Sequence, residues 1–232
     1  MAEYLHLDKG EGVATITIDR PEVRNAVPGG GWDALHDLFD AVARDDEVRV
    51  LVLTGAGEDF CSGADVGGDR AERQPHPLDS MRSVGRACQT LHTLPKPTIA
   101  RVDGVAAGAG LNIDFGGSFI LPRIVGMQRA KELVMLADVI DATRAYEMGL
   151  INRVVPREDL DALVGEFVEK LLAGPPIALA TSKKLLNQSF SSTLEEALEA
   201  EGIGQAYQFT TVDTAEAMTA FVEKRPPRFI GR

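Results

Sequence analysis

The stretch K-P-T-I-A-R-V-D-G-V-A-A-G-A-G, Lys96 to Gly110, joins a short apolar segment to a run of small residues. Prolines at 95 and 97 end the helical pattern before it, and Thr98 to Val102 is then typical of a buried strand. The glycines that follow predict a turn between this strand and a helix, where free backbone N–H groups point at whatever lies at the helix N-terminus. Such a turn can bind a carboxylate, a phosphate or a thioester oxygen, or it can simply let two backbones pack closely.

Three familiar glycine and serine motifs do not fit this chain. A dinucleotide-binding fingerprint needs a glycine three positions after Gly110, where Ile113 stands. A phosphate-binding P-loop needs a Gly-Lys-Ser or Gly-Lys-Thr triplet, which the sequence lacks. Neither Ser62 nor Ser118 lies in the G-x-S-x-G pattern of a nucleophile elbow. The sequence therefore supports neither dinucleotide binding nor serine nucleophilic chemistry.

Strand and helix patterns alternate upstream of this stretch. The alternating pattern of Val13 to Asp19 predicts a half-buried strand that pairs with a segment around Leu5 and Leu7 in a hairpin. The next expected elements are a helix with Trp32, Leu35, Leu38, Phe39 and Val42 on one face, a buried strand from Val48 to Thr54, and a helix from Ser80 to Leu94. This alternation predicts a mostly parallel sheet with helices packed on it.

Helices dominate the chain from Phe119 onward. The predicted helices include Glu158 to Ala173, Pro176 to Phe190 and Thr193 to Tyr207. We therefore divide the chain into an α/β core, residues 1–175, and a helical C-terminal region, residues 176–232.

Composition and charge exclude several classes of protein. The 232 residues hold 24 Lys and Arg against 35 Asp and Glu, a net charge of −11, and this balance argues against nucleic-acid binding. Cys61, Cys88 and four scattered histidines form no disulfide framework and no metal-ligand spacing, so we expect no metal. The N-terminus lacks a signal pattern and no long apolar run occurs, so we expect a cytoplasmic protein that neither crosses nor binds a membrane.

A second turn of small residues, F-C-S-G-A-D at Phe60 to Asp65, follows the preceding predicted strand. Two strand-to-helix turns on neighbouring strands can each direct one backbone N–H at a single oxygen, which is the geometry of a two-donor oxyanion hole. Cys61 fits this turn better as a small buried residue than as a nucleophile. On the two turns alone close backbone packing is the favoured interpretation, and the oxyanion role depends on the motifs that follow.

Several motifs in order show that the sequence resembles the crotonase superfamily, the enoyl-CoA hydratases and isomerases, over nearly its whole length. They are I-D-R-P-E-V-R-N-A at Ile18 to Ala26, F-C-S-G-A-D at Phe60 to Asp65, the opening stretch at Lys96 to Gly110, R-A-K-E-L at Arg129 to Leu133, A-Y-E-M-G-L-I-N-R-V-V at Ala145 to Val155, and F-V-E-K-R-P-P-R-F at Phe221 to Phe229. The resemblance implies an α/β crotonase-like fold, in which repeated ββα units form a core sheet packed by helices, with a helical C-terminal trimerisation region.

The resemblance also implies a site. The oxyanion donors would be the backbone N–H groups of Ala64 and Ala109, which would close on the thioester carbonyl of an acyl-CoA. No cofactor is expected, because coenzyme A is part of the substrate. Two of the implied contacts, Phe221 and Lys224, would reach a neighbouring subunit's site in a homotrimer or a dimer of trimers. The implied coenzyme A contacts are Arg24, Ala26, Ala64, Asp65, Val66, Phe221 and Lys224.

Asn112 and Asp114 bear on the type of reaction. Hydratases of the family use two carboxylates, and Asn112 stands where one of them is expected; an amide can orient water but cannot take its proton. Asp114 matches a position that some enoyl-CoA isomerases of the family use as the acid/base. Its alternative role is that of a helix N-cap. We therefore expect double-bond isomerisation in preference to hydration, with decarboxylation or dehalogenation as lesser options.

The same place suggests a missing segment. A helix that begins near Ala109 reaches Asp114 and a new glycine turn after about four residues, too few for a stable helix. We expect roughly 25 to 30 residues to be missing between Asn112 and Asp114 from the chain printed here, with natural deletion as the alternative. That segment could carry a second hydratase carboxylate, and a real deletion would favour a catalytically silent acyl-CoA binder. An RNA-associated homologue is a third interpretation, which the acidic charge opposes.

Overall fold

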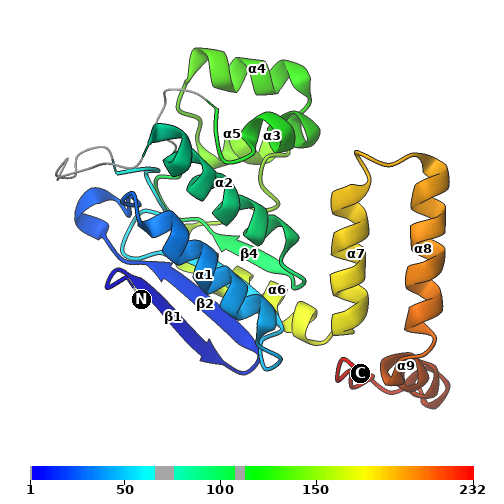
Figure 1. Ribbon diagram of the computed structural model, residues 1–232. Coiled ribbons are helices and arrows are strands. Elements are labelled where there is room, and N and C mark those ends of the chain that lie inside the picture. Colours follow the sequence, from blue (N-terminus) through cyan, green and yellow to red (C-terminus); the bar gives the residue numbers. More distant parts are fainter. Residues whose placement is uncertain (1, 66–75, 108–112) are drawn as a thin grey trace.

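A computed structural model describes residues 2–65, 76–107 and 113–232 (Figure 1). Its sheet has four strands in the order β1-β2-β3-β4, with β1 antiparallel to β2 and the other two pairs parallel. The strands are β1 Leu5–Gly10, β2 Val13–Ile18, β3 Val50–Gly55 and β4 Thr98–Arg101. The predicted hairpin and the predicted parallel pairing are both confirmed. Strands β2, β3 and β4 lie within two residues of their expected bounds. The expectation that β4 is buried is wrong, because Thr98 and Ala100 are exposed and Ile99 and Arg101 are half-buried at this edge of the sheet.

Two helices cover one face of this sheet (Figure 1). They are α1 Gly31–Arg44 and α2 Pro77–Thr93, which also contact each other. The five apolar residues that predicted α1 from their helical spacing are all buried. They pack with Ile16 and Leu51, both 0% exposed, in one hydrophobic core. The period of the sequence therefore decided which side of α1 faces the sheet.

Helix α6, Leu160–Leu172, contacts β3 and β4, and Figure 1 shows it behind the sheet, opposite α1 and α2. A short 3-10 turn, η2 Arg157–Asp159, leads into it. An ion pair between Arg101 and Asp161 joins the end of β4 to α6. The sheet thus lies between two helical layers, as parallel strands require.

Three helices form a smaller unit above the sheet in Figure 1. They are α3 Gly117–Val125, α4 Met127–Leu136 and α5 Ala142–Glu147. Val125, Ala130 and Met148 make a separate small apolar cluster there. A 3-10 turn, η1 Pro21–Val23, lies between β2 and α1.

The last three helices extend away from the sheet layers (Figure 1). They are α7 Pro176–Gln188, α8 Leu194–Gln208 and α9 Val212–Glu223, and we call them the C-terminal arm. Lys183 Nζ donates to the Lys96 carbonyl at 2.9 Å and Asn187 Nδ2 to the His92 carbonyl at 2.8 Å, which attaches α7 to the core. The helical character predicted for this region is confirmed. Among the described residues, no helix is both long and apolar enough to span a membrane.

Candidate functional site

Three loops meet where the parallel strands end. The first loop, residues 19–27, follows β2; the second, residues 56–65, follows β3; and the third, residues 102–107, follows β4. The second loop bridges the first at Val27 and Ala64 and the third at Cys61 and Ala106. It therefore lies between the other two, as β3 lies between β2 and β4. Crevices at the carboxyl ends of parallel strands are the usual place for ligands in such sheets.

Asn25 joins the first loop to the second. Its side chain is fully buried, and its Oδ1 accepts a hydrogen bond from the Arg20 N–H at 2.9 Å. Its Nδ2 donates to the carbonyls of Ala56 at 2.9 Å and Asp59 at 2.6 Å. Gly55 has to be glycine here, because a Cβ would lie 2.6 Å from Asn25 Nδ2 and closer still to the backbone of the second loop. The sequence pattern showed Asn25 only as part of a motif and gave no sign of this role.

Asp59 joins the second loop to the third. Its Oδ1 accepts from the Val105 N–H at 2.8 Å, and the Val105 carbonyl accepts from the Cys61 N–H at 3.0 Å. Gly104 turns the backbone there with a φ of 54°, and a Cβ on it would lie 2.0 Å from the Glu58 carbonyl oxygen. The glycine-rich turn after β4 therefore packs closely against the second loop. This close contact holds the third loop in place.

Ala64 presents a backbone donor beside these contacts. Val27 bonds to both neighbours of Ala64: its N–H donates to the Gly63 carbonyl and its carbonyl accepts from the Asp65 N–H, each at 2.8 Å. In a parallel bridge the central residue's own N–H points the other way. The Ala64 N–H therefore points away from the first loop, toward the side of the third, and has no hydrogen-bond partner among the described residues.

Four predicted contact residues come together at this end of the sheet. Ala26 is buried, Arg24 has a side chain that is 67% exposed, and Ala64 and Asp65 lie across the bridge from Val27. Arg24 Nε lies 3.9 Å from Asp59 Oδ2, so the guanidinium lies at the solvent-exposed edge of the first and second loops. Three other predicted site residues, Val66, Ala109 and Asn112, lie outside the described residues.

Asp114 is half-buried just before α3. The N-cap of that helix is Gly116, with no side-chain cap, so the N-cap role considered for Asp114 is wrong. Only its backbone carbonyl takes part in the turn, accepting from the Gly117 N–H at 2.8 Å. Its carboxylate makes no hydrogen bond or ion pair with the described part of the chain.

The residue after Asp114 is anchored in the main core. The ring of Phe115 lies 4.6 Å from that of Trp32 in an edge-to-face contact, and the Cys88 thiol donates to the Phe115 carbonyl at 3.0 Å. Ala64 and Cys61 pack against the same core cluster as Phe115. Burial raises the pKa of both thiols, which disfavours the reactive thiolate at Cys61 and Cys88.

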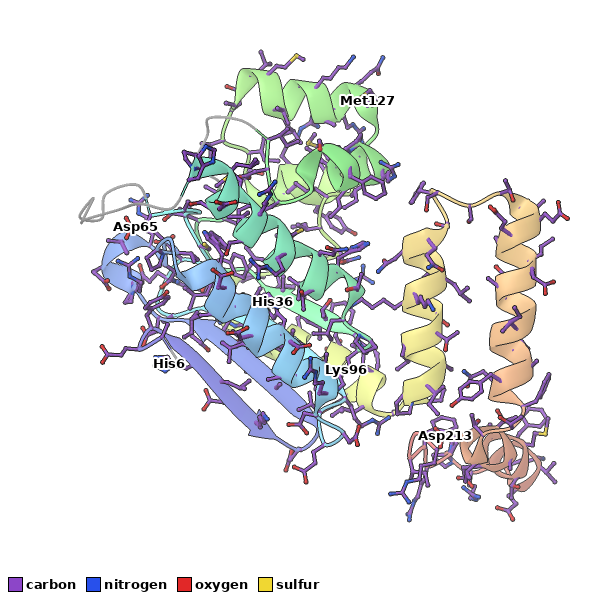
Figure 2. The ribbon with its side chains drawn as sticks, viewed as in Figure 1. His6, His36, Asp65, Lys96, Met127 and Asp213 are labelled. Carbon is purple, nitrogen blue, oxygen red and sulfur yellow. The ribbon has the colours of Figure 1, made fainter. Side chains whose placement is uncertain are left out.

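The C-terminal contacts lie elsewhere within one chain. Phe221 is 85% exposed near the end of α9, and Lys224 is the C-cap of that helix. Figure 2 shows Asp65 and Asp213, the latter from α9, at opposite ends of the molecule. A single chain therefore does not bring Phe221 and Lys224 to Ala64. Their expected place in a neighbour's site stays a prediction.

A shallow depression that is open to solvent lies along α8, away from these loops. Its lining is Leu194, Glu195, Leu198 and Glu199. Two carboxylates would repel the phosphates of a coenzyme A thioester. The loops at the strand ends are the better candidate site.

Comparison with models of protein families shows which family the chain belongs to. The model of the enoyl-CoA hydratase/isomerase family matches residues 8–115 and 112–232. The chain belongs to the enoyl-CoA hydratase/isomerase family. This family assignment confirms the resemblance to the crotonase superfamily, and it makes the protein an enzyme of this kind.

Individual relatives cover almost the whole chain. It is 32% identical over 262 residues to a 1,2-epoxyphenylacetyl-CoA isomerase of Escherichia coli, with 100% of both chains covered. It is 31% identical over 261 residues to a crotonyl-CoA hydratase of Syntrophomonas wolfei, with 99% of both covered. The crystal structure of an enoyl-CoA hydratase from Bacillus anthracis superposes with a TM-score of 0.91 at 27% identity, covering 99% of this chain and 100% of that one. These structural matches confirm the crotonase-like fold.

The relative from E. coli is longer than this chain. The alignment with the E. coli relative spans 262 positions and includes all 232 residues here, so about 30 positions of that relative have no counterpart. The family model also splits into two matches that meet at residues 112–115, where Asp114 lies. A segment of this size was expected between Asn112 and Asp114. That the protein itself carries such a segment stays a prediction.

Proposed function

We propose that the protein is an enoyl-CoA isomerase, which moves the double bond of a 3-enoyl-CoA thioester into conjugation with the carbonyl. The observation that carries the proposal is that Ala64, whose N–H has no hydrogen-bond partner among the described residues, packs on the same hydrophobic core as Phe115, the residue directly after Asp114. No cofactor takes part, because coenzyme A arrives with the substrate.

The Ala64 N–H, together with that of Ala109, would receive the thioester oxygen. Loss of a proton from C2 places negative charge on this oxygen, so a fixed donor stabilises the enolate more than the substrate. Each such donor is typically worth about 3 to 4 kcal/mol in the transition state. Alanine suits this position because a bulky side chain would keep the carbonyl from the backbone. The hydrogen bonds through Asn25 and Asp59 support the role by holding the three loops together.

Asp114 would carry the proton. Its carboxylate accepts the proton from C2 as the enolate forms, and the same carboxyl group returns it to C4 as the double bond reforms between C2 and C3. The proton is retained and water is not consumed, so one carboxylate suffices. Phe115, anchored by Trp32 and Cys88, would keep the carboxylate in place during the transfer.

Hydration is the second candidate. It is favoured by the likeness to the hydratase of S. wolfei, whereas the likeness to the E. coli isomerase favours isomerisation. Asn112 argues against hydration because its amide cannot take a proton from water. A hydratase would need its second carboxylate in the segment expected between Asn112 and Asp114. Without any such group, binding of acyl-CoA without turnover is the remaining alternative.

The coenzyme A contacts are proposed to come from two subunits. The bent coenzyme A part of the substrate would contact Arg24, Ala26, Asp65 and Val66 of one chain. Phe221 and Lys224 would come from a neighbouring chain. Arg24 and Lys224 would supply local positive charge that the net charge of −11 does not. This arrangement requires a homo-oligomer with closed symmetry, a trimer or a dimer of trimers.

The Asp114→Asn variant tests this proposal. We expect isomerisation of a 3-enoyl-CoA to fall by about 10²- to 10⁴-fold, the usual cost of a lost general base, with binding of a saturated acyl-CoA nearly unchanged. Asp8→Asn, at an exposed position of β1, is the matched control and should retain full activity. Isomerisation that survives in Asp114→Asn at the wild-type rate would contradict the proposal.

A further inference from the structure

We propose that Arg20 is a positioning residue for the reaction, because it clamps the first and second loops together beside the Ala64 donor. The proposal rests on the function proposed above. In the sequence Arg20 belongs to the I-D-R-P motif, and its long-range contacts in the fold give it a separate role.

The Arg20 guanidinium holds both sides of the bridge between Val27 and Ala64. Its Nη1 donates to the Ala26 carbonyl at 2.7 Å and to Asp65 Oδ2 at 2.8 Å. Ala26 precedes Val27 and Asp65 follows Ala64, so one nitrogen links the two segments at the bridge itself. Because Ala64 lies between Gly63 and Asp65, a shift of Asp65 would turn the Ala64 N–H.

Arg20 is itself fixed in place. Its N–H donates to Asn25 Oδ1 at 2.9 Å and its carbonyl accepts from the Asn25 N–H at 2.8 Å. Its guanidinium carbon lies 5.6 Å from the centre of the Tyr4 ring, within the range of a cation–π contact. Because both its backbone and its guanidinium are held, Arg20 can fix the positions of Ala26 and Asp65.

The clamp is sheltered from solvent. The side chains of Arg20 and Asp65 are 21% and 13% exposed. Ionic hydrogen bonds are short and strong where water is scarce, whereas exposed ion pairs hold geometry weakly. The ion pair of Arg44 and Asp40 on α1 is exposed, with 78% of the Arg44 side chain accessible, and it lies outside the site. It therefore serves as the comparison for the sheltered pair of Arg20 and Asp65.

Two variants of Arg20 and a control, each with two measurements, form the main test of the clamp. Arg20→Met keeps the apolar stem but removes the donors, Arg20→Lys keeps a charge and donors on a shorter side chain, and Arg44→Met is the control. The first measurement is kcat and KM for a 3-enoyl-CoA. The second is the infrared carbonyl stretch of bound butyryl-CoA labelled with carbon-13 at the thioester, which reports hydrogen bonding to that oxygen without turnover.

We expect Arg20→Met to lower kcat by about 10- to 100-fold with little change in KM, since misplacement of a donor costs the transition state most. The downshift of the bound carbonyl stretch should shrink in the same variant. Arg20→Lys should recover part of both effects, and Arg44→Met should match the wild type. If Arg20→Met acts through Asp65, its effect on kcat should not add to that of Asp65→Asn.

The results separate this proposal from the proposed function. A wild-type carbonyl shift in folded Arg20→Met would overturn the clamp, even if kcat falls. If Arg20→Met does not fold, Arg20→Lys and Asp65→Asn take its place, and an unchanged shift in them overturns the proposal whereas a reduced shift supports it. A wild-type protein that neither binds nor converts acyl-CoA would overturn the function as well, whereas bound butyryl-CoA with an unaltered shift in the variants would overturn the clamp alone.

Discussion

The sheet layers and the C-terminal arm differ in how far they bury their large apolar side chains. Ile16 and Leu51 in the sheet are fully buried beneath α1 and α2, and Val50 is fully buried on the opposite face of β3. In residues 176–232 the buried residues are Thr211, Asp213 and Ala220. The face of the sheet beneath α1 and α2 therefore completes its packing within one chain, whereas the arm leaves large side chains in contact with water.

The arm is nonetheless held by specific polar contacts. Its tail folds back so that the Ile230 and Gly231 N–H groups donate to the two Asp213 carboxylate oxygens at 2.7 and 2.9 Å. Such contacts define a conformation but remove little apolar surface from water. Exposed Leu194, Leu198 and Phe221 are the residues that a second subunit would cover. The contrast suggests that the core folds by itself and that the arm needs assembly.

The largest expected effect comes from removing the end of the arm. Deletion of residues 221–232 should abolish the oligomer and weaken coenzyme A binding, while the far-ultraviolet circular dichroism of the core persists. Because the deletion also removes the partners of Asp213, Phe221→Ser is the milder test, and Val139→Ser, at a fully exposed residue outside the arm, is its control. Analytical ultracentrifugation measures the assembly. A monomeric wild type with full activity would contradict this view of the arm.

The next largest expected effect is a loss of folding stability, compared between a buried leucine in the core and an exposed leucine in the arm. Leu51→Ala in β3 should lower the free energy of unfolding by about 2 to 5 kcal/mol, because it leaves a cavity in the core. Leu198→Ala in α8, at a residue 57% exposed, should cost less than about 0.5 kcal/mol in dissociated chains. Urea unfolding at low protein concentration measures both. Equal losses would show that the arm is packed in the monomer.

A matched pair of asparagines sharpens the comparison for polar groups. Asn25→Ala leaves the Arg20 N–H and two second-loop carbonyls without their partner, and should cost about 1 to 3 kcal/mol for each group that stays unsatisfied. Asn187→Ala on α7 removes one hydrogen bond, to His92, and should cost about 0.5 to 1.5 kcal/mol. Thermal unfolding followed by calorimetry gives both values. A larger loss at Asn187 would reverse the ranking of the two regions.

The last comparison concerns Lys183, where the arm meets the core. Burial lowers the pKa of its amine to about 8, against 10.5 when unfolded. Between these pH values the unfolded chain binds the proton and the folded chain does not, so this group makes stability rise with pH from about 8 to 10.5. We expect the rise to be smaller in Lys183→Met than in the wild type, and unchanged in Lys184→Met at the exposed neighbour. Urea midpoints at pH 8 and pH 10 measure it, and identical slopes in the wild type and Lys183→Met would show that the amine is not held by the fold.

Much of the fold was predictable because the hydrophobic period records which side of each element is buried. The face of α1 and the alternation of β2, with Ala14, Ile16 and Ile18 buried, follow directly from the sequence. The resemblance to the crotonase superfamily implied that Arg24, Ala26, Ala64 and Asp65 share one site, and the structure brings them together at the ends of neighbouring parallel strands. The roles of Asn25 and Asp59 did not, since their partners lie in other loops and only the strand pairing brings them close. Asp114 was open to an N-cap role because aspartate favours that position, but the left-handed backbone at Gly116 starts α3 two residues later.

The most direct test of the central claim, proton transfer by one carboxylate without water, is product analysis in oxygen-18-enriched water. The wild-type enzyme is given a 3-enoyl-CoA and a 2-enoyl-CoA separately, and the products are separated by chromatography and their masses are measured by mass spectrometry. The account predicts conversion of the 3-enoyl-CoA to the 2-enoyl isomer of identical mass, with no labelled oxygen in the products of either substrate. Rapid formation of an oxygen-18-labelled 3-hydroxyacyl-CoA from the 2-enoyl substrate, unaffected by Asp114→Asn, would contradict it and identify the protein as a hydratase.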